Sequence, residues 1–397
     1  MLSCAVDQCG QRKIRAKHPW VAARSIASLP DAESGRLIDV SDETGRFLAR
    51  GYVEKDSLYP VRILSFVREE IGPAFFERRI AEAAAARRRF IDPASTNVCR
   101  MVNEEGDNLS GLAVDLYGEH VLVQYFSRGM EAFADLIVPV LVKLVRPKGI
   151  YQLSRMTRSK IYPREPQRAH PTELAWGAEA PGAFCVRENG VQFLVSLEQG
   201  AKTGLYLDMR DNRRNVQRYS AGAAVLNAFA YTASFSVYAA IGGARKTVNI
   251  DLSRKANEWG KKNFALNGID PATHLFIADD VFEVMKRCQK RGDLFDMVIL
   301  DPPTFSKGIK KAYRAQKDYG QLCASAMRLL SPQGILACAL NSQELSERWF
   351  DERLREAGRI AKKRIRILGR GTQGPDYRVD AAFPEGRYLK FALLKAV

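Results

Sequence analysis

The feature that most constrains the fold is a regular alternation of apolar runs and helical patterns in the C-terminal half of the chain. Apolar runs typical of buried strands recur at intervals of roughly 30 residues, with helical patterns between them. These runs cover residues 224–229, 247–250, 274–277, 297–300 and 334–340. One helix is expected over 253–266, because Asn267 and Gly268 form a stop signal after it. The alternation predicts βαβ units and a parallel sheet, closed by an antiparallel pair over 364–368 and 388–394.

The preceding half of the chain shows other patterns. Short β-like segments joined by a glycine-bearing turn reach about residue 66 and predict a hairpin. A helix is expected from Pro73 to Phe90. Beyond it we expect paired strands over 111–118 and 121–126, one amphipathic helix over 130–145 and an exposed basic loop over 154–168. The prediction is therefore three parts: a β-rich domain over 1–70, a linker helix with a small central α/β domain over 71–190, and a third domain over 191–397.

Composition narrows the class of partner. The 397 residues contain 61 Lys and Arg against 45 Asp and Glu, a formal charge of +16, which favours a polyanion such as nucleic acid. No run of about 18 apolar residues occurs, so no membrane span is expected. The first ten residues lack the apolar core of a signal peptide. The seven cysteines are scattered and show no zinc-type pairing with histidine, so a reducing, cytoplasmic location without a metal is expected.

Polar residues follow each strand of the expected parallel sheet. In such a sheet ligands bind at the carboxyl ends of the strands. Asp251 can accept the ribose hydroxyls of an adenosine, and Asp279 or Asp280 can accept from its adenine amino group. The other candidate cofactor residues on or after the first and fourth strands are Asn227, Phe229, Tyr231, Thr232 and Asp301. Any single acid is more often surface decoration than ligand, but the row together favours an adenosine site.

The turn after the first strand indicates which adenosine cofactor fits. A dinucleotide site needs a glycine-rich turn there, and the chain has Tyr231-Thr232-Ala233-Ser234 instead. A phosphate-binding P-loop is also missing from the sequence. A ligand with adenosine but no phosphates, S-adenosylmethionine, fits better, and a dinucleotide oxidoreductase is nearly excluded.

The segment 301–305 (Asp-Pro-Pro-Thr-Phe) follows the strand at 297–300 and is the most distinctive motif. Each proline fixes its own φ and lacks an amide hydrogen, so the segment forms a stiff edge. Asp301 and the backbone carbonyls would form an acceptor array beside the flat face of Phe305, which suits a donor-bearing nucleobase. The alternative is an ordinary proline-capped strand end.

Together these segments resemble the bacterial 23S ribosomal RNA large-subunit methyltransferases that join a PUA domain to a class I methyltransferase domain. The resemblance covers nearly the whole chain, and its matching segments are 17–20, 48–51, 202–213, 229–232, 301–305 and 383–390. It implies an α/β fold: an N-terminal β-rich PUA domain, a small central α/β domain and a Rossmann-like methyltransferase domain. It further implies that Tyr206, Asp208 and Arg210 wall the cofactor site, that ribosomal RNA is the partner, and that a homodimer can form. Where the family usually carries glycine after the Tyr-Thr pair, this chain has Ala233 and Ser234.

The expected catalytic residues are Asp301, Pro302, Phe305 and Asn341. Carbon 5 of cytosine becomes nucleophilic only after a cysteine adds to the neighbouring carbon. In the cytosine-modifying members that cysteine lies just after the fifth strand, where this chain has Asn341. Cys338 and Cys323 are both expected in the core. Guanine N7 has an in-plane lone pair and needs only positioning, so the prediction is 7-methylguanine, with 5-methylcytosine as the alternative.

Two rival classes stay open. The first is an RNA-binding protein with an inactive methyltransferase domain, suggested by Ala233 and Ser234. The second is a small-molecule methyltransferase, which would need neither a basic β-domain nor a charge of +16.

Overall fold

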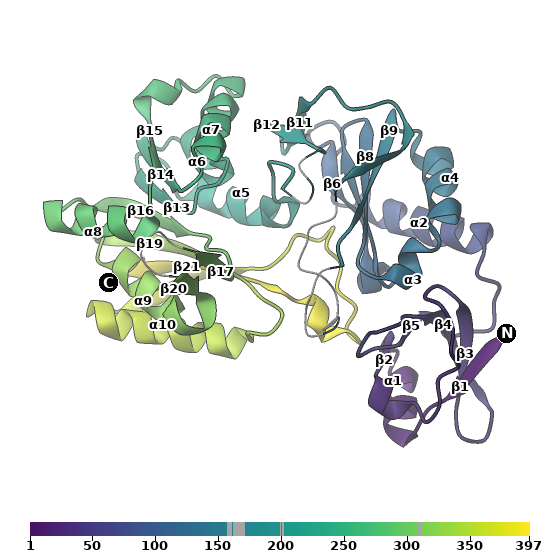
Figure 1. Ribbon diagram of the computed structural model, residues 1–397. Coiled ribbons are helices and arrows are strands. Elements are labelled where there is room, and N and C mark those ends of the chain that lie inside the picture. Colours follow the sequence, from purple (N-terminus) through teal and green to yellow (C-terminus); the bar gives the residue numbers. More distant parts are fainter. Residues whose placement is uncertain (157–160, 162–170, 199, 201, 308–311) are drawn as a thin grey trace. The chain divides into compact units, whose positions relative to one another are not determined.

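The computed structural model of the protein (Figure 1) describes residues 1–156, 161, 171–198, 200, 202–307 and 312–397. The chain forms two compact units, and neither is one continuous stretch. Unit 1 comprises Met1–Asn189, Val195–Thr203 and Pro375–Gly386, and unit 2 comprises Gly190–Leu194, Gly204–Gly374 and Arg387–Val397. The finer division of the chain at residues 70 and 190 stays a prediction.

Unit 1 begins with a five-stranded sheet of order β1-β3-β4-β5-β2, in which only β1 and β3 run parallel. Its elements are β1 (Leu2–Ala5), α1 (Gln8–Arg15), β2 (Trp20–Val21), β3 (Leu37–Ser41), β4 (Phe47–Val53) and β5 (Val61–Ser65). The predicted hairpin is confirmed as β3 and β4. Its turn is fixed by Asp42, whose carboxylate accepts from the backbone nitrogens of Thr44 and Arg46.

The second sheet of unit 1 has the order β10-β9-β8-β7-β6 and is antiparallel except for β8 and β9. Helices α2 and α4 pack against it through a core that includes Phe76, Val114 and Leu141 (Figure 1). The elements are α2 (Pro73–Arg87), β6 (Val98–Asn103), β7 (Leu112–Tyr117), β8 (His120–Tyr125), α3 (Arg128–Glu131), α4 (Ala134–Val145), β9 (Gly149–Ser154) and β10 (Glu173–Gly177). The predicted helix after Pro73 and the strand pair are therefore confirmed.

The prediction of one helix over 130–145 is wrong. Two helices, α3 and α4, replace it, and the break falls at Phe133, which leaves helical geometry at the start of α4. Its ring packs against Tyr52 and Phe76, with centroids 5.9 and 5.5 Å apart. Tertiary packing of this ring overrides the local helical pattern. Most of the basic loop predicted over 154–168 lies outside the described residues.

Unit 2 contains a seven-stranded sheet of order β15-β14-β13-β16-β19-β21-β20. The first five of these strands are parallel, and β21 runs antiparallel to both β19 and β20. The strands are β13 (Ala224–Ala228), β14 (Lys246–Asp251), β15 (Leu275–Ala278), β16 (Phe295–Leu300), β19 (Leu330–Asn341), β20 (Ile365–Gly371) and β21 (Leu389–Ala396). The predicted parallel sheet and closing antiparallel pair are confirmed, and the chain order reverses between β13 and β16.

Helices cover both faces of this sheet (Figure 1). They are α5 (Arg210–Arg218), α6 (Ser234–Ile241), α7 (Arg254–Leu266), α8 (Val281–Arg291), α9 (Ala315–Met327) and α10 (Glu347–Ala361). Alternate residues of each strand pack into different hydrophobic cores, because successive side chains point to opposite faces of the sheet. Met297 and Ile299 pack with residues of α5 and α6, whereas Val298 and Leu300 pack with residues of α8 and α9.

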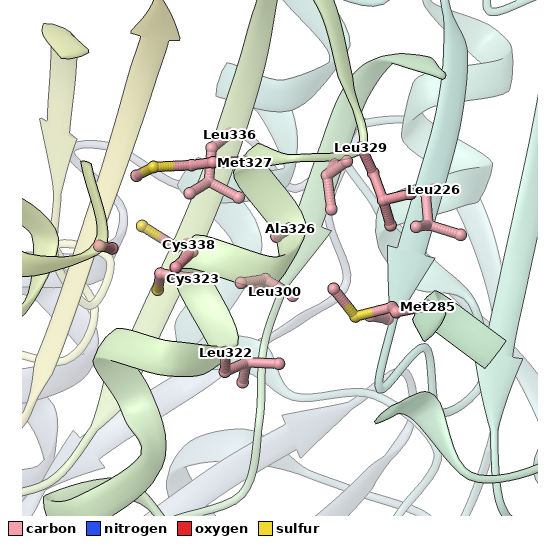
Figure 2. Close-up of a cluster of buried hydrophobic side chains, with 14 of the residues drawn as sticks. Leu226, Met285, Leu300, Leu322, Cys323, Ala326, Met327, Leu329, Leu336 and Cys338 are labelled. Atoms are coloured by element: carbon pink, nitrogen blue, oxygen red, sulfur yellow. The ribbon is translucent and has the colours of Figure 1, made fainter. Parts of the chain in front are cut away.

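Figure 2 shows the core on the α8–α9 face, where Cys338 of β19 and Cys323 of α9 lie among Leu336, Met327 and Leu322. Both cysteines are fully buried, which confirms the prediction that they are core residues.

The remaining elements are short. The 3-10 helices are η1 (Ala23–Ser25), η2 (Glu104–Asp107), η3 (Leu207–Met209), η4 (Pro271–Thr273) and η5 (Pro384–Gly386). Two strand pairs are also present, β11 (Ala183–Glu188) with β12 (Val191–Ser196) and β17 (Phe305–Lys307) with β18 (Ala312–Arg314).

Candidate active site

The carboxyl edge of the parallel strands in unit 2 gathers most of the predicted site residues. Asp251 ends β14, Asp279 and Asp280 follow β15, Asp301 follows β16, and Asn341 ends β19. Because neighbouring parallel strands end at the same edge, the fold brings these positions to one rim of the sheet.

The turn between β13 and α6 is strained. Phe229, Tyr231 and Ala233 adopt φ values of 62°, 50° and 60°, in the left-handed region that disfavours residues other than glycine. Backbone hydrogen bonds hold the turn, from Ala230 N to Ile250 O (2.9 Å) and from Ala233 N to Ala230 O (2.8 Å). Strain of this kind gathers at ligand sites, where surrounding contacts must impose it. Ala233 therefore adopts a left-handed backbone conformation that glycine would reach at lower energetic cost.

Asp251 fixes this turn to the end of β14. Its Oδ2 accepts from Tyr231 N (2.8 Å) and its Oδ1 from Ser253 N (2.9 Å). Each carboxylate oxygen has more than one acceptor site, so both can also take a hydroxyl hydrogen from a ribose. The carboxylate is thus held in one orientation before any ligand arrives.

The two acids after β15 have local partners. Asp280 caps α8, accepting from the backbone nitrogens of Phe282 (2.9 Å) and Glu283 (3.3 Å). Asp279 forms an ion pair with Arg287 at 2.5 Å. Sequence patterns had suggested adenine recognition here, and the structure adds a capping role for Asp280.

A segment from 204 to 208 lies against the strained turn. Gly204 N donates to Tyr231 Oη (3.0 Å), and Thr232 Oγ1 donates to Gly204 O (2.7 Å). The ring of Tyr206 is 46% exposed, and its centroid is 5.3 Å from that of Tyr231. The two tyrosines thus offer aromatic surface beside the carboxylate rim.

Asp208 and Asp301 form a like-charged pair at the rim. Burial and, to a smaller extent, the negative charge of Asp208 raise the pKa of Asp301 to about 7, while Arg213 acts in the opposite direction. Among the described residues, no side chain donates a hydrogen bond to the Asp301 carboxylate. Asp208 Oδ2 accepts from the Tyr388 hydroxyl at 2.9 Å. A bound cation or hydrogen-bond donor would therefore stabilise the ionised form of Asp301.

Two predicted cofactor residues are enclosed. Asn227 is 1% exposed, and its Nδ2 donates to Ser236 Oγ of α6 at 2.9 Å. Arg210 is 3% exposed, with its Nε 3.4 Å from Asp211 Oδ1. These contacts give both residues a packing role within unit 2.

Comparison with known proteins places the chain in a family. A family model described as S-adenosylmethionine-dependent methyltransferase matches residues 167–382, and one described as PUA-like domain matches 6–66. The chain belongs to the S-adenosylmethionine-dependent methyltransferases. Among its relatives, "Ribosomal RNA large subunit methyltransferase I" of Tolumonas auensis is 34% identical and covers 98% of this chain and 97% of its own. The protein of the same name from Alteromonas mediterranea is 35% identical over 96% and 95% of the two chains.

A solved structure agrees with the fold. The crystal structure of SMU.776 complexed with SAH superposes with a TM-score of 0.90 at 25% identity and covers 100% of both chains. The protein is thus an enzyme with S-adenosylmethionine as its cofactor and a Rossmann-like catalytic fold. None of the described helices has the length and apolar character needed to cross a membrane.

The residues of the rim fit this cofactor. The carboxylates of Asp208 and Asp301 suit the positive charge of a sulfonium or amino group, and Asp251 suits ribose hydroxyls. Within the described ranges no group of three or more metal-binding side chains gathers, and methyl transfer from a sulfonium needs alignment rather than a metal.

The segment 301–305, predicted to contact the target base, continues the rim beyond β16. Pro302 is buried, while Phe305 is 50% exposed and carries the guanidinium of Arg314 5.8 Å from its ring centroid. Thr304 Oγ1 donates to the backbone oxygen of Asn341 at 2.7 Å, so the segment is tied to the end of β19. The Asn341 side chain is exposed.

Sequence reasoning did not single out Arg213, Tyr388 and Lys390, whose contacts involve residues of the predicted site. All three fall within segments that carry the family resemblance, 202–213 and 383–390. Their roles depend on contacts such as Tyr388 with Asp208, 180 residues apart in the chain. The pairing of β21 with β19 brings Tyr388 and Lys390 to the rim, whereas Arg213 lies on α5.

Proposed function

We propose that this methyltransferase modifies a base of 23S ribosomal RNA, and that the modified atom is the N7 nitrogen of a guanine. The names of its relatives, the PUA-like domain and the charge of +16 support an RNA substrate. A ribosomal substrate also favours a cytoplasmic location. A homodimer belongs to the same proposal, and light scattering of the purified protein tests it.

The observation that carries the choice of atom is the residue at the end of β19. Methylation at carbon 5 of cytosine needs a thiolate within reach of the base. Asn341 occupies the end of β19, and the three cysteines of unit 2, Cys288, Cys323 and Cys338, are all buried. Burial also raises the pKa of Cys323 well above its ordinary value, which keeps this thiol protonated.

Guanine N7 needs no covalent help from the protein. The cofactor supplies a methyl group activated by its bond to a positively charged sulfur. The N7 lone pair forms the new bond to the methyl carbon as the carbon–sulfur bond breaks, and no proton has to leave the base. We assign Phe305 to stacking on the flipped base, and Asp301 and Asn341 to orienting its edge, on the stiff frame that Pro302 provides.

Nucleoside analysis of ribosomal RNA from a deletion strain tests the proposal. Loss of 7-methylguanosine from large-subunit RNA, restored by the wild-type gene, is expected. Loss of 5-methylcytidine alone would favour the alternative substrate atom.

The inactive alternative has its own test. If Ala233 and Ser234 had abolished cofactor binding, calorimetry with S-adenosylmethionine would show no heat. We expect saturable binding, because Ala233 already adopts the left-handed geometry at φ 60°.

A further inference from the structure

Lys390 is a buried lysine at the rim of the sheet. It lies on β21 opposite Leu340 of β19 and is 5% exposed. Its Nζ donates to the backbone oxygen of Ser342 and reaches that of Tyr388 at 3.4 Å. The side chain therefore caps the position where the β19–β21 ladder ends.

The contacts of Lys390 join the two halves of the site. Ser342 directly follows Asn341, whose backbone oxygen is held from the other side by Thr304. Ser342 N donates to Tyr388 O at 2.8 Å, and the Tyr388 hydroxyl donates to Asp208. A continuous chain of bonds thus runs from the carboxylate rim through Tyr388 to the segment that presents Asn341.

The charge of Lys390 is unusual for a buried residue at the start of a strand. Among the described residues no carboxylate lies within ion-pair distance of its ammonium. Burial lowers the pKa of Lys390, and the more distant Glu347 only partly opposes this effect. A buried charge without a counter-ion is costly, so a role beyond packing would explain why it is present.

We infer that Lys390 is a positioning residue of the methyl-transfer site, which sets the path of Asn341 and Ser342 and locks it to Tyr388 and the cofactor rim. This inference rests on the proposed function. Displacement of a target-positioning segment by about 1 Å is enough to lower a rate by about 100-fold.

Lys363 provides a matched control, because it contacts the opposite end of β19. Lys363 Nζ donates to the backbone oxygen of Leu330, the first residue of β19, at 2.9 Å, and burial lowers its pKa as well. The two lysines thus make the same kind of bond to β19, but only Lys390 does so at the carboxyl edge.

The test compares Lys390→Met with Lys363→Met in the full-length protein, using ribosomal RNA and labelled S-adenosylmethionine. For Lys390→Met we expect kcat to fall tenfold or more, with the KM for RNA and the Kd for S-adenosylhomocysteine within about twofold of wild type. Lys363→Met should keep wild-type kcat, and Lys390→Arg, which retains a charged donor, should recover part of the loss. Wild-type kcat in Lys390→Met, or equal losses in the two methionine variants, would overturn the inference.

A replacement variant and a wild-type control complete the test. If Lys390→Met does not fold, Lys390→Gln replaces it, because glutamine keeps a neutral donor but is too short to reach Ser342 O; wild-type kcat in that variant would equally overturn the inference. If the wild-type enzyme itself transfers no methyl group to RNA while still binding S-adenosylhomocysteine, the proposed substrate is wrong.

Discussion

Two clusters of charged side chains, one in each unit, are arranged in opposite ways. In unit 1, Arg87 donates two hydrogen bonds of 2.6 Å to the carboxylate of Asp107, and Arg100 donates hydrogen bonds of 2.5 Å and 3.1 Å to that of Asp115. In unit 2, Asp301 sits beside the like charge of Asp208, and Lys390 is buried against backbone oxygens. Paired charges of the first kind give rigidity, whereas perturbed charges of the second kind are typical of functional sites.

The largest expected effect comes from removing one partner of the buried ion pairs in unit 1. Arg87→Met should lower the free energy of unfolding by about 3–5 kcal/mol, because it leaves Asp107 buried without its main partner. Urea unfolding measures the loss, and Arg88→Met is the control, since Arg88 is the exposed neighbour in sequence. A loss below about 1 kcal/mol would show that the buried pair does not hold unit 1 together.

The next effect concerns the site carboxylate. Asp301→Asn should lower kcat about 100-fold, since it removes the carboxylate that we assign to both the edge of the base and the positive charge of the cofactor. The same change should raise the melting temperature at pH 8. The pKa of Asp301 is raised to about 7 in the folded protein, so the wild type loses stability as the pH rises from the ordinary aspartate pKa to about 7, and that loss is complete at pH 8.

Asp296, on the strand that Asp301 follows, provides the matched control with the opposite sign. Its pKa is lowered, chiefly by a hydrogen bond from Ala224 N and also by Ser331 and Arg245, so its contribution to stability is present above its unfolded pKa and is lost in acid. Asp296→Asn should therefore lower the melting temperature at pH 8. Melting curves that shift in the same direction for both variants would contradict the contrast.

Phe305 tests the target-facing surface. Phe305→Ala should weaken RNA methylation by about 1–3 kcal/mol, or roughly 5- to 150-fold, the range measured for loss of one base–aromatic stack. S-adenosylhomocysteine affinity and melting temperature should stay unchanged, because half of the ring is already exposed. Ile367→Ala, at a 55% exposed position of unit 2, is the control. Equal methylation rates in the two variants would remove Phe305 from the target site.

Cofactor affinity should depend on pH through Asp301. A positively charged ligand favours the ionised carboxylate, so S-adenosylmethionine should bind about tenfold more tightly at pH 8 than at pH 6, with the change centred near pH 7. Calorimetry across this range measures the effect. Asp301→Asn should flatten the profile, and a wild-type profile that is already flat would contradict the assignment.

The smallest effect belongs to the strained turn. Ala233→Gly relieves a left-handed alanine but frees the unfolded chain and removes a buried methyl group, so stability should change by no more than about 1 kcal/mol. Cofactor affinity should stay within about threefold of wild type by calorimetry. A gain of tenfold or more would mean that alanine had impaired the site.

Local sequence pattern predicted the elements well where burial is periodic. The parallel strands, the antiparallel pair of β20 and β21, and the buried Cys323 and Cys338 all follow from alternation and turn signals. The helix break at Phe133 and the capping role of Asp280 depend on contacts that periodicity does not encode. Asp296 and Asp301, five residues apart, have opposite pKa shifts, because burial dominates at Asp301 whereas hydrogen bonds, first from Ala224 N, dominate at Asp296.

The inclusion of Pro375–Gly386 in unit 1 could not be predicted either. This segment joins β20 to β21 of the other unit, yet Asp376 accepts from Arg100 N and its backbone oxygen accepts from Arg87. The partners lie more than 270 positions apart in the chain, beyond the reach of any local pattern.

The most direct measurement is the identity of the methylated nucleoside made by the purified enzyme. Large-subunit ribosomal RNA lacking the modification would be incubated with the protein and S-adenosylmethionine carrying a deuterated methyl group, then digested and analysed by mass spectrometry. We predict deuterated 7-methylguanosine, lost in Asp301→Asn and retained when Cys323 and Cys338 are replaced by alanine. Deuterated 5-methylcytidine that disappears with either cysteine would contradict the account.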